Sequence, residues 1–259
     1  MILERRQFLQ GLPALIPAAL AAAPADAPRT RFYVFEQYFL EQGTQSARIH
    51  DFFSKALLPA MEKIHKGPKI FLDAVMTPHM PQVAAIFGLE SPDQVWSVSK
   101  ALFANPEFSR AFDQWEAGEA PYVSASASLL EATDYSPEIV APAKPPAAPR
   151  VFELRVYHSP TVRQAKALHQ RFSGAEVKIF HRVGINPLFY STTVFGAARP
   201  NLTYLIPFDT LAAREKAWDA FSADPEWVRV RKESIDRSGQ ISITSNHSLY
   251  KATAYSPIR

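Results

Sequence analysis

Three polar residues alternate with apolar ones in the segment Phe152 to Tyr157, which has the form Glu153-x-Arg155-x-Tyr157. In a β-strand, residues two apart lie on the same face, so these three side chains would project together. A carboxylate in apolar surroundings acquires a raised pKa suited to acid/base chemistry. We therefore predict a catalytic site in which Glu153 is the acid or base, while Arg155 and Tyr157 orient a carboxylate or phenolate. The alternative is that Glu153 only holds its strand in register by bonding to a helix N-terminus or to an arginine such as Arg155.

Histidines and further polar residues extend this predicted site. His50 and His169 lie at matching positions of two predicted helices, and a neutral imidazole at either could act as a base or as a haem ligand. Their alternative role is capping a helix or packing at an interface between parts of the chain. We assign His169 to the catalytic group, and we predict a substrate-binding group made of Tyr190, Asn186, Tyr204, Glu36 and His50.

No metal ligand set is predicted, because the chain has no cysteine and no closely spaced histidine motif. The sequence also lacks the glycine-rich phosphate motifs and the G-x-S-x-G motif of hydrolases. The 28 basic and 25 acidic residues are spread along the chain and leave a net charge of +3. Nucleic-acid binding is therefore not expected, and the cofactor, if there is one, is not identified by the sequence.

The elements that position these residues occur twice. Asn105-Pro106-Glu107-Phe108 reappears as Asp224-Pro225-Glu226-Trp227, and three further segments repeat in the same order at separations of 117 to 120 residues. Four collinear repeats indicate a duplication. We predict a first module at residues 31–137, a Pro/Ala-rich linker at 138–150 and a second module at 151–259.

Hydrophobic periodicity predicts the order β-α-β-β-α-β in each module, with a bent second helical region. The expected strands are 31–40, 69–76, 82–88 and 122–130, and then 151–158, 188–195, 202–208 and 240–251. Long helices are expected at 45–66 and 161–182, each closed by a glycine. Phe103, Phe108, Phe112 and Trp115 form a helical stripe of the kind that normally packs in a core. The fold class is α+β, with tandem ferredoxin-like modules packed face to face as a pseudo-dimeric barrel.

Residues 1–27 have the features of an export signal. Arg5-Arg6 precede an apolar stretch at 11–23 that is too short to span a membrane, and Ala25-Asp26-Ala27 resembles a cleavage site. We predict export by the twin-arginine route to the periplasm or the outside of the cell, with no integral membrane span left after cleavage.

With this element order, the chain resembles the NIPSNAP family of the dimeric α+β barrel superfamily. The resemblance lies in the segments 152–157, 184–190, 201–205, 214–218 and 224–227 of the second module. The first module has Glu36-x-Tyr38-x-Leu40 in place of the Glu-x-Arg-x-Tyr pattern, so we expect it to serve mainly as scaffold.

The resemblance implies a barrel of two modules, as in a dimer or a tandem chain. Members of the wider superfamily include cofactor-free monooxygenases, isomerases and cyclases of small aromatic molecules, and haem-binding enzymes. The functional hypothesis is an exported small-molecule enzyme, aromatic or haem-type, with an acid/base pocket in the barrel. The alternative is a non-catalytic scaffold that binds a ligand or a protein, and a third option is a homo-oligomer with only a structural role.

Overall fold

The computed structural model describes residues 29–144, 146 and 148–259, so the predicted signal peptide at 1–27 lies outside the described residues. The first half of the chain contains, in order, β1 (Phe32–Phe39), α1 (Gln45–Phe52), the π-helix η1 (Phe53–Leu57), α2 (Leu58–Ile64), β2 (Lys69–Met76), β3 (Gln82–Leu89), α3 (Gln94–Phe103), α4 (Pro106–Glu116) and β4 (Ser124–Ala132).

The second half repeats this order. It contains β5 (Val151–His158), α5 (Val162–Arg171), the π-helix η2 (Phe172–Glu176), α6 (Val177–Arg182), β6 (Phe189–Phe195), β7 (Asn201–Phe208), α7 (Leu211–Ala223), α8 (Pro225–Ser238) and β8 (Thr244–Ala252). The two predicted long helices are each interrupted by one π-helical turn. The described part of the predicted linker contains neither helix nor strand.

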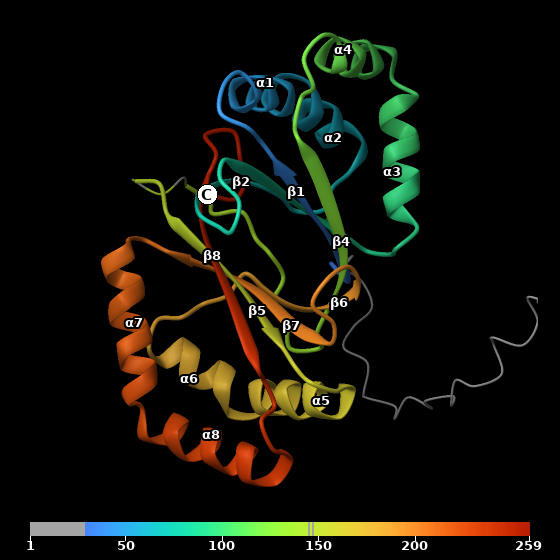
Figure 1. Cartoon of the computed structure of the whole chain (residues 1–259). Helices are drawn as coiled ribbons and strands as arrows, with labels where there is room; N and C mark the ends of the chain where they lie inside the picture. The colour runs from blue at the N-terminus through green and yellow to red at the C-terminus, as the bar shows by residue number, and fades with distance from the viewer. Residues whose placement is uncertain (1–28, 145, 147) are drawn as a thin grey trace, which may run out of the picture.

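The eight strands close into a barrel in the order β1-β3-β2-β8-β5-β7-β6-β4. Within each half the strand order is the same, β4-β1-β3-β2 and β8-β5-β7-β6, and all the pairs are antiparallel. The halves join where β2 pairs with β8 and β4 pairs with β6. The expected α+β fold with a closed barrel is confirmed, and helices α1–α4 and α5–α8 lie on opposite sides of it (Figure 1).

Alternation along the strands divides the apolar residues into three cores. One fills the barrel and includes Tyr33, Phe35, Phe152 and Leu154. The other two lie between the barrel wall and the helices of each half. Glu36 and Glu153 alternate with the barrel-filling residues and so face the helices. The pocket expected inside the barrel is therefore not where these carboxylates point.

Local sequence signals fix the helices that cover the wall. Asn105 and Asp224 each accept two backbone N–H groups at the start of a helix, and a proline follows each cap. Among the described residues, no helix has the length and apolar character needed to cross a bilayer. No group of three or more potential metal ligands is found in the same part of the chain.

Candidate functional site

Glu153 lies at the centre of a hydrogen-bonded cluster between β5 and α7. Its Oε1 accepts hydrogen bonds from Arg155 Nε at 2.8 Å and from an Arg214 terminal nitrogen at 2.7 Å. Its Oε2 accepts from Arg214 Nε at 2.9 Å and from Trp218 Nε1 at 2.8 Å. The side chain is fully buried. All the principal acceptor positions of this carboxylate are therefore occupied by the protein itself.

Burial acts to raise the pKa of Glu153, but the hydrogen bonds from Arg214 and the charge of Arg155 outweigh it and hold the pKa below its ordinary value. The Arg155 guanidinium also lies 3.6 Å from the centre of the Trp218 ring and donates to the Tyr157 hydroxyl at 2.7 Å. The structure brings Glu153, Arg155 and Tyr157 together on one strand face, as predicted. The hydrogen bonds of Glu153 favour a structural role, in which it links β5 to α7. Acid/base catalysis by Glu153 stays a prediction.

Of the predicted substrate-binding residues of the second half, the two tyrosines lie in the core and the asparagine lies at the surface. Tyr190 and Tyr204 are almost fully buried and pack on each other with ring centres 5.6 Å apart. Asn186 is exposed in the connection between α6 and β6.

The two histidines contact tyrosines that follow the last strand of the opposite half. His169 Nδ1 lies 2.9 Å from the Tyr135 hydroxyl, and His50 Nδ1 lies 3.0 Å from the Tyr255 hydroxyl. His50 Nε2 is also 3.0 Å from Asp73. These contacts link the two halves and leave neither histidine beside Glu153 or Glu36, which matches the interface role considered for them.

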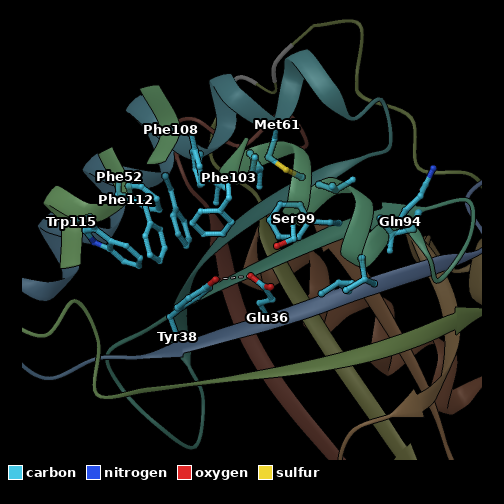
Figure 2. A pocket seen from close by; sticks show the side chains of 18 of the residues that line it. Glu36, Tyr38, Phe52, Met61, Gln94, Ser99, Phe103, Phe108, Phe112 and Trp115 are labelled. Carbon is cyan, nitrogen blue, oxygen red and sulfur yellow. Dashed lines mark hydrogen bonds between the residues drawn. The ribbon is translucent and has the colours of Figure 1, made fainter. Parts of the chain in front are cut away.

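A cavity of about 230 Å³ lies in the first half, between β1 and the helices α1–α4. Figure 2 shows Glu36 and Tyr38 rising from the strand toward a group of aromatic side chains above them. The aromatic side chains of the helices that line it are Phe52, Phe53, Phe103, Phe108, Phe112 and Trp115. The helix stripe assigned to packing therefore also forms a cavity wall, and the half expected to be scaffold holds the cavity.

Glu36 is the only carboxylate among the residues that line this cavity. Its Oε2 accepts a hydrogen bond of 2.6 Å from the Tyr38 hydroxyl. No cation pairs with it among the described residues. Burial raises the pKa of Glu36 above its ordinary value, although the Tyr38 hydrogen bond opposes this. Such a carboxyl can hold a proton at higher pH than a solvated one and can donate or accept it in the cavity.

Two residues of α3 that the sequence gave no reason to select shape this cavity. Counted back from the Asn105 and Asp224 helix caps, Val95 corresponds to Arg214 and Ser99 to Trp218. Both line the cavity. Neither carries a conspicuous chemical signal, but comparing the repeats position by position would have shown that two large side chains are missing here.

Haem does not fit this cavity. The cavity has no histidine among its lining residues, and the two histidines considered as ligands contact Tyr255 and Tyr135 instead. Its volume is also below the range of about 300–1,000 Å³ that is usual for sites of drug-sized ligands. The cavity is suited to a compact molecule.

Comparison with known protein families gives one match, to the NIPSNAP family over residues 152–257. This confirms the resemblance predicted for the second half. No curated protein matches the sequence.

Solved structures with a similar fold cover most of the chain at low sequence identity. An anthrone oxidase-like protein has a TM-score of 0.54 and 11% identity, with 86% of this chain and 92% of that one covered. A proposed monooxygenase from Fusobacterium nucleatum has a TM-score of 0.51 and 8% identity, with 86% and 93% covered. A NIPSNAP family protein of unknown function from Agrobacterium tumefaciens has a TM-score of 0.37 and 17% identity, with 42% and 94% covered. At these identities the first two likenesses concern the fold alone.

Proposed function

Starting from a chain whose second half is a NIPSNAP domain, we propose that its first half binds a compact, largely apolar molecule in the aromatic cavity. Glu36, together with Tyr38, is the group that exchanges a proton or a hydrogen bond with the polar atom of that molecule. The observation that carries the proposal is a carboxyl group with a raised pKa and one hydroxyl partner in an otherwise apolar cavity. This is the arrangement expected of a general acid or base.

The alternative, a non-catalytic scaffold that binds a ligand or a protein, predicts no closed pocket and no titrating carboxyl group. The raised pKa of Glu36 beside the cavity favours a small-molecule function over this alternative. Because the acceptors of Glu153 are occupied, the proposed site moves from Glu153 to Glu36.

Filling the cavity tests the binding part of the proposal. Ser99→Trp places an indole where Trp218 stands in the second half, and Ser97→Trp puts the same side chain on an exposed position of α3. Compact aromatic compounds should raise the melting temperature of the wild type and of Ser97→Trp, and this shift should be lost in Ser99→Trp. Equal shifts in all three proteins would refute the cavity as the binding site.

Replacing the carboxyl group tests the chemical part. With a neutral compound identified by that screen, Glu36→Gln should keep binding within a few fold and lose turnover, because the amide preserves shape but cannot transfer a proton at neutral pH. Mass spectrometry of the incubated compound would detect conversion. A compound that binds but is never converted by the wild type would leave a binding protein rather than an enzyme.

We further propose that the halves are tandem copies of one module, with boundaries near residues 31–137 and 151–259. The repeated element order and strand order support this. Residues 148–259 expressed alone would leave β6 and β8 without their partners β4 and β2, so the fragment should dimerise to satisfy these edges. A folded monomer in light scattering would contradict the proposal.

Export by the twin-arginine route remains part of the proposed function. Its support is the Arg5-Arg6 pair and the short apolar stretch that follows. Protein recovered from the periplasm should have the mass of a chain that begins at residue 28. Replacing both arginines by lysine should retain the uncleaved chain in the cytoplasm.

A further inference from the structure

Glu36 and Glu153 occupy equivalent positions in the two halves, but the side chains around them differ. In the second half, Arg214 and Trp218 on α7 reach across to Glu153. In the first half, the corresponding residues of α3 are Val95 and Ser99, which cannot reach Glu36 as donors of the same kind. The carboxylate is retained, and the groups that occupy the space in front of it are not.

The other charged residues of that space are replaced as well. Arg155 lies two residues after Glu153 on β5, and the residue two after Glu36 on β1 is Tyr38. Arg171 and Glu176 form a buried ion pair, 2.7 Å apart, and follow His169 by two and seven residues. The residues that follow the equivalent His50 by two and seven residues are Phe52 and Leu57, which are apolar and line the cavity. Of the charged residues in the second-half cluster, only Glu153 has a charged counterpart in the first half, namely Glu36; the positions of Arg155, Arg171 and Arg214 carry uncharged side chains there.

The second half shows which chemistry the retained carboxylate position accepts. A planar guanidinium binds Glu153 through two nitrogens at 2.9 and 2.7 Å, and an indole N–H adds a third donor. In the first half, Tyr38 and Phe52 stand at the positions of Arg155 and Arg171, and aromatic faces attract cations. The donors that the chain no longer supplies can come from a ligand.

We propose that the first-half cavity takes an organic cation, an amidine, guanidine or amine on a compact apolar body, whose N–H groups bind Glu36 as Arg214 binds Glu153. This names the ligand class of the proposed function and rests on it. The ligand's apolar body packs against Phe108 and Phe112, and its charge replaces the missing arginine.

The charge state of the cavity depends on few groups. The titratable side chains that line it are Glu36, Tyr38 and Tyr122, while the lining residues of α1, η1, α2, α3 and α4 are all uncharged. A cation binds the ionised form of Glu36. Its affinity therefore rises with pH as Glu36 loses its proton, and the affinity of a neutral compound of the same shape does not.

Benzamidine and benzamide form a matched pair of probes, because they share a flat aromatic body and differ in charge. Calorimetry on the full chain between pH 5 and pH 8 should show benzamidine binding at pH 8 about tenfold more tightly than benzamide, a difference of about 1.4 kcal/mol. The preference should shrink toward pH 5. In Glu36→Gln it should be lost at every pH.

A second variant removes the cavity's capacity for a cation without touching Glu36. Val95→Arg supplies an internal guanidinium at the position of Arg214 and should abolish benzamidine binding, while Ser97→Arg on the exposed face of α3 should leave it unchanged. If Val95→Arg does not fold, the pH profile and Glu36→Gln still decide the question.

Each outcome separates this inference from the proposed function. Benzamide binding as tightly as benzamidine at every pH overturns the cation inference and leaves a cavity for neutral molecules. Benzamidine binding that survives both Glu36→Gln and Val95→Arg also overturns it. Failure of benzamidine, benzamide and all compact aromatic compounds to bind overturns both proposals.

Discussion

Glu36 and Glu153 occupy equivalent positions on β1 and β5, yet one borders a cavity and the other is enclosed by four hydrogen bonds. The backbone around them is nearly the same, since both strands sit at the second position of the order β4-β1-β3-β2 and β8-β5-β7-β6. Much of the difference comes from α7, whose Arg214 and Trp218 supply three of the four hydrogen bonds, where α3 has Val95 and Ser99. The fourth comes from Arg155 on β5, where β1 has Tyr38. A few side-chain differences thus decide whether the space between sheet and helix is open or filled.

The largest expected effect that separates the two halves is on stability. Glu153→Gln should lower the free energy of unfolding at pH 7 by about 3–5 kcal/mol, because it removes the carboxylate that pairs with the buried Arg155; the partly exposed Arg214 keeps its contact with Glu215. Glu36→Gln should change it by less than about 1 kcal/mol, since Glu36 has one hydroxyl partner and no cation. Urea unfolding of the two variants measures both. Similar losses of unfolding free energy in both variants would contradict a difference between the two carboxyl environments.

The second effect is a pH dependence of opposite sign at the two carboxyl groups. The pKa of Glu36 is raised in the folded chain, so the folded state holds this proton more tightly than the unfolded state. Its contribution to stability is full below the unfolded carboxyl pKa of about 4.3 and is lost as pH rises through the folded pKa. Glu36→Gln should therefore match the wild type near pH 4 and become relatively more stable as pH rises toward 7.

Glu153 works in the other direction, because its pKa is lowered in the folded chain. Its contribution is full above about 4.3 and is lost as pH falls through the folded pKa. The gap between the wild type and Glu153→Gln should close on acidification. Unfolding curves from pH 3 to pH 8 test both signs, and a gap that widens on acidification for Glu153→Gln would refute the assignment.

The fold could be predicted from sequence because it depends on patterns that local physics controls. Alternation and turn residues gave the strands 69–76 and 151–158 with the bounds that the structure has, and the repeated Asn-Pro and Asp-Pro caps marked the last helices. The π-helical turns were not expected, since hydrophobic spacing over a long helix hardly changes when one residue is added to a turn.

The site was harder to predict, because what matters there is partly an absence. Arg155 and Tyr157 attracted the prediction as polar residues at strand spacing, and the structure shows that they help to fill their own half. Val95 and Ser99 are unremarkable in the sequence, and they matter only because a helix places them above Glu36. A position-by-position comparison of the repeats carries that information, whereas the residue types in either half alone do not.

The smallest expected effect lies at the two contacts that join the halves. Tyr135→Phe and Tyr255→Phe each remove one hydrogen bond to a histidine, which is worth about 0.5–1.5 kcal/mol. The costs should differ, because His50 keeps its contact with Asp73 after the loss of Tyr255. His169 keeps only an uncharged backbone contact at Asn201, and burial lowers its pKa, so loss of Tyr135 would leave an uncharged ring nitrogen unpaired and partly buried. Tyr135→Phe should therefore lower the urea midpoint more than Tyr255→Phe. Asp73→Asn combined with Tyr255→Phe should remove that difference, and a difference that persists in the double variant would show that Asp73 is not its cause.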